Sequence, residues 1–398
     1  MSEDYTQADL AFKIRKTLRY IKLYGFSRTI MKIRGQYHMK ADTGFEGSTW
    51  KNPACRSSDH KARNTAIIGC GNFAYSNIAY YLAKYNPRFL RAAHDIRKER
   101  ALSLCRTYKG SYATDDVGEL LNDDNIDIVY IASNHASHAE YAVSCLEAGK
   151  HVHIEKPHAV TEDQLTRLTE AMVAHPELNV FLGFNRPRSR LFLDLQNMLA
   201  QEDGPIMINW FIAGHEIPED HWYFDEKEGG RVLGNLCHWT DLTLHLVSLD
   251  RAFPCTIVSS TPKDAESDFA VSVIFGDRSC ASITFSAKGH TFEGVREVLN
   301  LHKGSLLANL TDFQYLTMDV VEKKIKKKLF HRDHGHKANI IHSAVGSVSD
   351  SVEGEPLVYT YLTARFYLAI RESIDTGNEV TLSESVFDEV PLPAASRD

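Results

Sequence analysis

The sequence lacks several features that define special classes of protein. No run of about 18 apolar residues occurs, so we expect no transmembrane helix. The seven cysteines form no Cys-x-x-Cys pair, which argues against a disulfide framework and against a structural zinc site. The first ten residues are polar and acidic and have no apolar core like that of a signal peptide, so we expect a cytoplasmic protein.

Positive charge is scarce outside the first segment of the chain. Residues 1–63 hold 13 of the 45 lysines and arginines but only 6 of the 52 acidic residues, which leaves 32 basic against 46 acidic residues in the remainder. Such an acidic body argues against nucleic-acid binding. The 398 residues, 43% of them apolar and 24% charged, are enough for a folded protein of two domains.

The first segment is basic and has a helical pattern. Nine cations and one acid lie between residues 9 and 40, and we expect two amphipathic helices broken near Gly25. Such an arm attaches to an anionic membrane surface or a partner through residues 10–40, or packs on its own domain or a neighbouring subunit. Residues 41–63 are predicted to be a linker, so residues 1–63 form a basic helical extension and linker. The apolar positions at helical spacing are Leu10, Ile14, Leu18 and Ile21.

Residues 64–185 alternate between strand and helix patterns. This alternation predicts a doubly wound parallel sheet with helices on both faces, that is, a dinucleotide-binding Rossmann domain. The expected strands lie at 66–71, 90–96, 126–133, 151–155 and 179–184, and the expected helices at 77–85, 98–108, 138–148 and 162–174.

Residues 186–398 have a different pattern, with strands in close succession. We expect an α+β domain for substrate binding and oligomerisation, built on a large, mostly antiparallel sheet with helices on one face. The lysine run at 323–328 is interpreted as a solvated face or strand end. The expected strands lie at 206–214, 255–260, 269–275, 280–287, 296–302, 304–310 and 313–320, and the expected helices at 191–200 and 233–246.

A glycine-rich turn follows the first strand of the Rossmann pattern. Gly69 allows a tight turn, Gly71 lets the backbone approach a pyrophosphate, and the small Ala74 lets the next helix pack closely. The helix N-terminus then stabilises the anion. We therefore predict that this turn, with Asn72 and Phe73, binds a dinucleotide.

The second strand ends in an acid that favours one cofactor. Asp95 lies 24 residues after Gly71, where its carboxylate accepts hydrogen bonds from ribose hydroxyls, which favours NAD. Arg97 is close enough to pair with a 2′-phosphate, so NADP stays open.

A lysine follows the strand at 151–155. Lys156, between Glu155 and Pro157, is predicted to lie at the carboxyl edge of the sheet, where such sheets bind ligands. Flanked by a carboxylate and facing a cationic nicotinamide, it is expected to have a lowered pKa and to share the proton of a substrate hydroxyl. Taken alone, this tripeptide is more typical of a surface lysine beside a proline that ends a strand.

Four segments together resemble one protein family: GCGNFA at residue 69, ASNHASHAEYAVSCLEAGKHVHIEKP at 132, GFNRPRSR at 183 and GGRVLGNLCHWTDL at 229. They are similar to the Gfo/Idh/MocA oxidoreductases, with a resemblance that covers residues 65 to about 390. Residues 213–239 look most like the branch in polysaccharide and lipopolysaccharide sugar pathways. The resemblance implies an NAD(P)-dependent sugar dehydrogenase that acts on a nucleotide-sugar or related glycan precursor and forms a homodimer or tetramer.

The resemblance also implies roles for single residues. Lys156 and His238 would be the catalytic acid and base, and many relatives carry an aspartate four residues before the histidine, where this chain has Gly234. We expect Asn235, Asp241 or the His221-Trp222 pair as its substitute. The further implied cofactor contacts are Ser133, Asn134, His138 and Glu155, and the expected substrate contacts are Asn185, Arg186, His221, Trp222, Arg231 and Asp241.

There are three alternatives to the interpretation as a sugar dehydrogenase. His238, Asp241 and His245 have spacing that suits metal ligands, but the family needs no metal and we expect none. A non-catalytic NAD(P)-binding sensor or scaffold is favoured by the missing acid at Gly234. A redox-neutral enzyme would keep NAD tightly bound and reduce and reoxidise it within one cycle.

Overall fold

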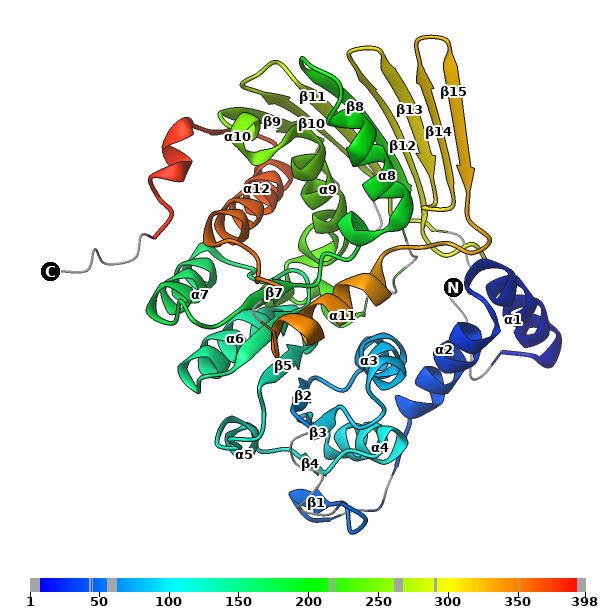
Figure 1. The fold of residues 1–398 in the computed structure, drawn as a ribbon, viewed down its shortest axis with the longest axis vertical. Helices are drawn as coiled ribbons and strands as arrows, with labels where there is room; N and C mark the ends of the chain where they lie inside the picture. The colour runs from blue at the N-terminus through cyan, green and yellow to red at the C-terminus, as the bar shows by residue number, and fades with distance from the viewer. Residues whose placement is uncertain are drawn as a thin grey trace, which may run out of the picture.

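The computed structural model describes residues 8–42, 44, 46–55, 63–214, 217, 220–260, 268–289, 292–349 and 351–391. Two sheets, each packed against helices, form the body of the molecule, and the N-terminal helices lie at one side (Figure 1). The Rossmann sheet and the second, mostly antiparallel sheet are confirmed. Among the residues just given, no helix is long and apolar enough to span a bilayer.

The first sheet has seven strands in the order β1-β4-β3-β2-β5-β6-β7. All neighbours from β4 to β7 are parallel, whereas β1 pairs with β4 in the antiparallel sense. The central strands β2 and β5 are buried on both faces, as expected where helices cover a parallel sheet on two sides. The strands are β1 (Thr49–Lys51), β2 (Thr65–Ile68), β3 (Leu90–His94), β4 (Tyr112–Thr114), β5 (Ile128–Ile131), β6 (His151–Ile154) and β7 (Val180–Leu182).

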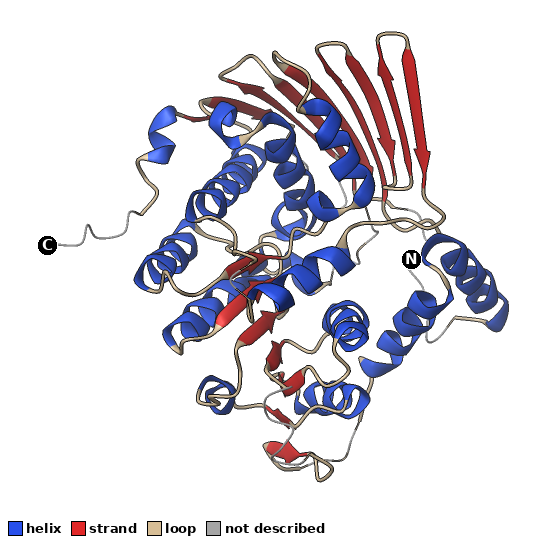
Figure 2. Ribbon diagram, viewed as in Figure 1, coloured by secondary structure: helices blue, strands red, loops and turns tan. Residues whose placement is uncertain are grey.

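Helices cover both faces of this sheet (Figure 2). Ala66 and Ile68 of β2 belong to the core shared with α6 and α7, whereas Ile67 belongs to the core shared with α3 and α4. Alternate side chains of a strand therefore point to opposite layers. The helices are η2 (Ala74–Ile78), α3 (Ala79–Tyr85), α4 (Lys98–Tyr108), α5 (Val117–Leu121), η3 (His135–Ser137), α6 (His138–Glu147) and α7 (Glu162–Ala174).

The second sheet has nine strands in the order β15-β14-β13-β12-β8-β11-β10-β9-β16, and among them only β8 and β11 pair in parallel. Burial alternates along β8 and β10, so one face is covered and the other is open. The lysine run forms the edge strand β15 (Lys323–Lys328). The other strands are β8 (Ile206–Ala213), β9 (Cys255–Ser259), β10 (Phe269–Phe275), β11 (Cys280–Ser286), β12 (Arg296–Lys303), β13 (Leu306–Thr311), β14 (Tyr315–Val320) and β16 (Val380–Leu382).

Two C-terminal helices link this half of the chain to the first sheet. The buried helix α12 (Leu357–Thr376) packs against α7 and β9, and α11 (His336–Gly346) packs against α3. The predicted domain boundaries themselves stay a prediction. The remaining helices are η4 (Arg186–Arg188), α8 (Arg190–Leu199), η5 (Trp222–Phe224), η6 (Glu226–Glu228), η7 (Val232–Leu236), α9 (Cys237–Val247), α10 (Leu249–Ala252) and η8 (Glu384–Phe387).

The N-terminal segment forms the two expected helices, α1 (Leu10–Tyr24) and α2 (Phe26–His38), and they separate at Gly25, whose φ is 85°. Leu10, Ile14 and Leu18 of α1 are exposed, so this stripe does not pack on its own domain. The prediction of a linker over residues 41–63 was wrong in part, because β1 adds to the edge of the first sheet, where it pairs with backbone groups of β4. Residues 43, 45 and 56–62 of that span lie outside the described residues.

Candidate active site

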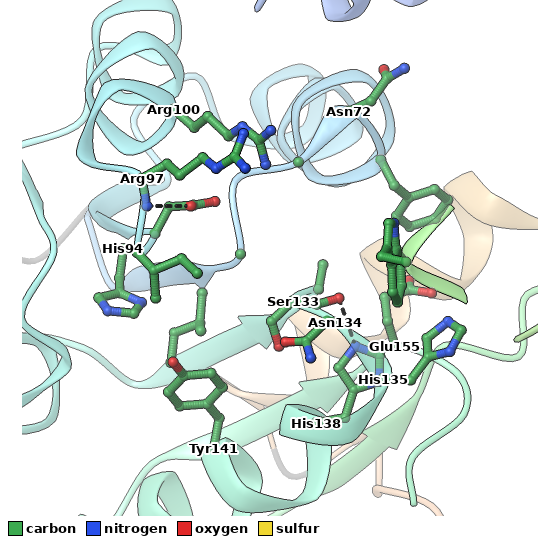
Figure 3. Close-up of a pocket in the computed structure, with 18 of the residues that line it drawn as sticks. Asn72, His94, Arg97, Arg100, Ser133, Asn134, His135, His138, Tyr141 and Glu155 are labelled. Carbon is green, nitrogen blue, oxygen red and sulfur yellow. Dashed lines mark hydrogen bonds between the residues drawn. The ribbon is translucent and has the colours of Figure 1, made fainter. Parts of the chain in front are cut away.

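A pocket of about 610 Å³ lies at the carboxyl ends of the parallel strands, where the strand order reverses between β2 and β5. It has two ends (Figure 3). We call them the Asp95 end, formed by Met39, His94, Asp95, Ile96, Arg97, Arg100 and Tyr141, and the Lys156 end, formed by His135, Glu155, Lys156, His221, Trp222 and Tyr223. Between them lie Ile68, Gly69, Gly71, Asn72, Phe73, Ala132, Ser133, Asn134 and His138.

The glycine-rich turn fits a bound pyrophosphate. Gly69 has φ 82°, and a Cβ there would overlap the backbone of Ser133, so glycine alone lets the end of β2 approach the end of β5. A Cβ at Gly71 would meet no protein atom within 4 Å, which leaves open space beside the pocket. Ala74 is completely buried and lies behind this wall rather than in it. The turn therefore offers backbone and space where a dinucleotide needs them.

At its own end of the pocket, the buried carboxylate of Asp95 organises the turn. It accepts hydrogen bonds from the backbone N–H of Cys70 at 2.7 Å and of Arg97 at 2.8 Å. The side chains of Arg97 and Arg100 lie next to each other at this end of the pocket (Figure 3). The acid expected for ribose binding and the arginine expected for a 2′-phosphate are thus brought together, and a second arginine joins them.

The loop after β5 forms the middle of the pocket. Ser133 and Asn134 line it, and His138 ties the loop to its neighbour. The Nδ1 atom of His138 lies 2.7 Å from the carbonyl oxygen of Pro157, and its Nε2 atom lies 3.2 Å from that of Ser133. Burial lowers the pKa of His138, so the imidazole is neutral and its single N–H donates to one of these two carbonyl oxygens.

Lys156 follows β6 and reaches across to the second half of the chain. Its Nζ atom donates a hydrogen bond to the carbonyl oxygen of Gly234 at 2.6 Å. Burial lowers the pKa of Lys156, but Tyr223, Cys237 and Glu155 together outweigh burial and raise the pKa above its ordinary value. The lowered pKa that the sequence predicted is therefore wrong for the protein groups alone.

An aromatic cluster closes the Lys156 end. The rings of His135, Trp222 and Tyr223 lie 4.5 to 4.7 Å apart, centroid to centroid. A Cβ at Gly234 would lie 2.6 Å from Cε1 of His135 and 2.7 Å from Cε2 of Tyr223. These two rings occupy the space where a side chain at position 234 would begin, so no acid fits there without moving them.

A buried glutamate joins the two halves of the chain at this place. The carboxylate of Glu228 accepts hydrogen bonds from the side chain of Asn134 and the backbone N–H of Ala136. The carbonyl oxygen of Glu228 also lies 2.9 Å from Nδ1 of His135. The segment that carries the aromatic cluster is therefore fastened to the loop after β5.

Several predicted site residues do not line the pocket. Nδ1 of His238 is buried without a hydrogen-bond partner, and burial, with Arg186 and Lys156, holds the pKa of His238 well below its ordinary value.

The buried guanidinium of Arg186 donates to Glu297 at 2.8 Å. The amide of Asn185 donates to the carbonyl oxygen of His334. Arg231 is buried, with its guanidinium 5.8 Å from the ring centre of Phe224. The lining residues therefore exclude His238, Asn185, Arg186, Arg231 and Asp241.

Asp241 lies in a buried network of its own. Its carboxylate accepts a hydrogen bond from the phenol of Tyr359, and burial raises the pKa of Asp241 well above its ordinary value. His245 lies 3.1 Å from the Tyr359 oxygen. Within the part of the chain that the structure describes, no three His, Cys, Asp or Glu side chains gather as metal ligands.

Sequence reasoning missed several lining residues. Met39 comes from the N-terminal extension, which carries no known cofactor motif. Arg100 lies five residues after Asp95, outside the part of the sequence that indicated a ribose site. His135 stands inside the segment that carried the family resemblance, so that signal was available. Tyr223 adjoins the His221-Trp222 pair, which was named, but only the tertiary structure places its ring over Gly234.

The family model for the Oxidoreductase family, NAD-binding Rossmann fold, of the Gfo/Idh/MocA group, matches residues 63–184. An inositol 2-dehydrogenase/D-chiro-inositol 3-dehydrogenase of Shouchella clausii is 33% identical over 191 residues, which is 42% of this chain and 55% of that protein. A myo-inositol 2-dehydrogenase of Thermotoga maritima is 31% identical over 140 residues, 35% of this chain and 41% of that protein. The matched stretch thus spans about half the length of these relatives.

Solved structures share the fold over most of the chain. A levoglucosan dehydrogenase in complex with NADH and L-sorbose superposes with a TM-score of 0.67 at 16% identity, covering 80% of this chain and 98% of the other. GenD2 from gentamicin A biosynthesis, in complex with NAD, gives a TM-score of 0.69 at 16% identity, covering 81% and 96%. The glycine-rich turn, Asp95 and Lys156 thus line one pocket, and all three lie in the stretch, residues 63–184, that matches the Oxidoreductase family, NAD-binding Rossmann fold.

Proposed function

We propose that the protein is an NAD-dependent oxidoreductase that transfers hydride between a carbinol carbon of a sugar or cyclic polyol and the nicotinamide. The observation that carries this proposal is the placement of the glycine turn, Asp95 and Lys156 along one pocket. The dinucleotide would run from Asp95, past Gly71, to Lys156. Relatives named as inositol dehydrogenases and a fold neighbour named as a levoglucosan dehydrogenase support the substrate class.

The cofactor, when bound, supplies the hydride acceptor or donor. The chain's own groups handle the proton. At neutral pH the raised pKa makes Lys156 an ammonium that donates a hydrogen bond to the reacting oxygen, and when Lys156 loses its proton it becomes the base for the substrate hydroxyl. The lowered pKa keeps His238, which does not line the pocket, a neutral imidazole. His238 follows Cys237, a neighbour whose potential reaches Lys156, so the two groups share one region.

The direction of proton transfer between Lys156 and the substrate follows from the protonation state of Lys156. Oxidation of an alcohol needs a base, so its rate should rise with pH as Lys156 loses its proton. Reduction of a ketone needs an acid, so it should be favoured at lower pH, where the ammonium persists. A cationic nicotinamide beside Lys156 would oppose the raised pKa and bring this change closer to neutrality.

A nucleotide-sugar substrate, which the sequence predicted, has less support. Arginines are the residues best suited to bind its phosphates, but Arg186, an expected substrate contact, pairs with Glu297, and the neighbouring Arg188 pairs with Glu355. A free sugar or polyol needs neither guanidinium. We therefore propose the uncharged sugar class first, with glycan-precursor nucleotide-sugars as the second substrate group to assay.

The test combines binding with turnover. Isothermal calorimetry with NAD and NADP measures cofactor uptake, and nicotinamide absorbance with a panel of inositols, anhydrosugars, aldoses and nucleotide-sugars measures hydride transfer. We expect NAD binding and turnover of at least one uncharged polyol or sugar. Absence of uptake of either dinucleotide, with none retained from purification, would overturn the proposal.

The two alternative functions predict different results in the same assays. A sensor or scaffold, favoured by the absence of a side chain at Gly234, binds dinucleotide and turns over nothing. A redox-neutral enzyme retains NAD through purification and converts substrate without added cofactor. Product formation measured by chromatography, alongside absorbance, separates these cases.

Two partner predictions also stay as proposals. Exposed apolar side chains on the open face of the second sheet, such as Met207, Phe211 and Ile274, support a homo-oligomer. The exposed stripe on basic α1 supports peripheral attachment to an anionic membrane. Light scattering and vesicle sedimentation measure them separately.

A further inference from the structure

Because residue 234 of η7 is a glycine, this helix presents no acidic side chain to Lys156 at that position. The aromatic ring of Tyr223 occupies the space instead. The carbonyl oxygen of Gly234 accepts the hydrogen bond from Lys156, while a Cβ on the same residue would lie 2.7 Å from the ring of Tyr223. Tyr223 therefore covers the residue to which the ammonium is bound. Both Lys156 and Tyr223 line the pocket.

The ring of Tyr223 is held by its surroundings. Its backbone N–H donates to Nδ1 of His221 at 3.3 Å. Its ring contacts those of His135 and Trp222, at 4.6 and 4.5 Å between centroids. Packed against two rings, the side chain of Tyr223 keeps its place beside Gly234, whose carbonyl binds Lys156.

We propose that Tyr223 is a positioning residue for Lys156, whose phenol sets the protonation of the ammonium in place of the absent side chain at position 234. Only the catalytic consequence of this role of Tyr223 rests on the proposed function. Among the neighbours that raise the pKa of Lys156, Tyr223 has the largest effect, followed by Cys237 and Glu155.

The experiment measures the protonation of Lys156 without cofactor or substrate. Acetylation by acetic anhydride across a pH series is quantified by mass spectrometry of the peptide that contains Lys156, with the exposed Lys324 as internal reference. Tyr223→Phe keeps the ring and removes the hydroxyl. We expect the midpoint for Lys156 to move to lower pH, while the midpoint for Lys324 stays unchanged.

Two further variants complete the design. Tyr85→Phe removes a phenol that is 53% exposed and should leave the midpoint unchanged. Gly234→Ala pushes the ring of Tyr223 away by its Cβ and should lower the midpoint as Tyr223→Phe does, which keeps the test decisive if one variant does not fold.

An unchanged midpoint in folded Tyr223→Phe overturns the proposal. The readout is independent of activity, so a shifted midpoint in a protein that turns over nothing supports the role of Tyr223 and contradicts the proposed function. If the protein is active, the rising limb of alcohol oxidation should move to lower pH in Tyr223→Phe, with the NAD dissociation constant changed less than about twofold.

A separate set of contacts concerns the N-terminal extension. Helix α2 packs on the glycine-rich turn and on the helix after it. Nε2 of His38 lies 2.7 Å from the carbonyl oxygen of Cys70, its Nδ1 lies 2.9 Å from the hydroxyl of Ser103, and its ring stacks on Tyr75 at 4.2 Å. Arg28 donates to the carbonyl oxygen of Ser76 in η2.

These contacts give His38 one tautomer. Burial lowers its pKa, so the ring is neutral at pH 7. The carbonyl of Cys70 needs a donor, which places the proton on Nε2 and leaves Nδ1 to accept from Ser103. Both backbone groups of Cys70 are then hydrogen-bonded. Its N–H donates to the carboxylate of Asp95, and its carbonyl oxygen accepts from Nε2 of His38.

We infer that α2 is a brace of the dinucleotide site, in which His38 fixes the turn between Gly69 and Gly71 and Met39 adds to the pocket wall. The matched family model begins at residue 63, so this brace lies outside it. A turn held in its binding geometry loses less conformational freedom when ligand binds, and therefore binds more tightly.

His38→Leu and His38→Gln test the brace. Leucine removes the hydrogen bond, whereas the glutamine amide can still donate to Cys70. We expect His38→Leu to weaken NAD binding about tenfold in calorimetry and to speed amide hydrogen exchange at residues 69–71, with partial rescue in His38→Gln. Leu18→Ala, on the exposed side of α1, should change neither.

Equal exchange rates at residues 69–71 in His38→Leu and in the natural protein overturn the brace. This measurement needs no ligand, so it decides the matter even if the protein binds no dinucleotide. Unfolding midpoints measured in parallel separate a local effect on the turn from a loss of global stability.

Discussion

The two ends of the pocket differ in how the chain builds them. The Asp95 end comes mostly from one continuous stretch, residues 94–100, and Asp95 is joined to Cys70 of the adjacent turn by a hydrogen bond across 25 residues. The Lys156 end joins segments far apart, because Lys156 bonds to Gly234 across 78 residues and Asn134 bonds to Glu228 across 94.

This difference has a functional meaning. On the proposed function, a local motif would hold the part of the dinucleotide that does not react, so the geometry of this motif follows from the sequence around it. The Lys156 end is assembled by the second half of the chain, which lets the reacting groups vary without changing the cofactor turn. Binding and chemistry should therefore respond to different substitutions.

The largest expected effect is on chemistry at the Lys156 end. Lys156→Met removes the ammonium and keeps the length of the side chain, so turnover should fall by about 10²- to 10⁴-fold, as is typical for loss of an acid or base. The NAD dissociation constant should change little. Steady-state absorbance and calorimetry measure the two, with Lys324→Met in an edge strand as the matched control. Unchanged turnover would remove the lysine from the mechanism.

The middle of the pocket should affect both ends. Gly69→Ala forces a side chain into φ 82° and against the backbone of Ser133, so it should cost about 3 kcal/mol of stability and abolish NAD binding. Gly204→Ala is the control, since Gly204 has φ 90° but its Cβ would meet nothing within 4 Å, and it should cost about 1 kcal/mol. Denaturant unfolding gives both values. Equal losses would mean that the approach to Ser133 does not matter.

The Asp95 end should respond in binding alone. Asp95→Ala removes a charged acceptor from the turn and the ribose, so NAD affinity should fall by about 10- to 100-fold, the range for hydrogen bonds to charged groups. Turnover at saturating NAD should stay close to that of the natural protein. Asp124→Ala, at an exposed acid, is the control. A large fall in turnover at saturation would contradict the separation of the two ends.

Mild acid should act most strongly at the Lys156 end, where His135 lies. Burial lowers the pKa of His38 and His94, and holds that of His135 well below its ordinary value. Their folded pKa values lie below the unfolded value of about 6.5, so the stability that they contribute is present above pH 6.5 and is lost as pH falls. For each histidine the loss is about 1.4 kcal/mol per pH unit until its folded pKa is reached.

Hydrogen exchange between pH 7 and 5 follows this loss along the chain. The loss begins near pH 6.5 for all three, and amides near His135 should lose the most protection, because its folded pKa is the lowest. At pH 5, Asp123 and Glu297 are still charged, because both have a pKa of about 2, so these two carboxylates do not obscure the effect. An equal loss at both ends would show that they unfold as one unit.

Much of the fold followed from periodicity. Alternating apolar strands and amphipathic helices predicted the parallel sheet, and the helices expected at 98–108 and 162–174 coincide with α4 and α7. The short strands β1 and β4 were missed, because three residues carry too little pattern. Helices α11 and α12 were missed as well, although α12 forms much of the core between the two sheets.

What the sequence by itself determined is the local chemistry of the Asp95 end and the position of Lys156, because a turn, a strand end and the next helix lie within reach of one another along the chain. Only the tertiary structure decided which groups face Lys156, why Gly234 has no room for a side chain, and that His38 holds the turn. Those contacts join segments that neither spacing nor composition relates, since burial and packing across domains act through space and leave no periodic signal.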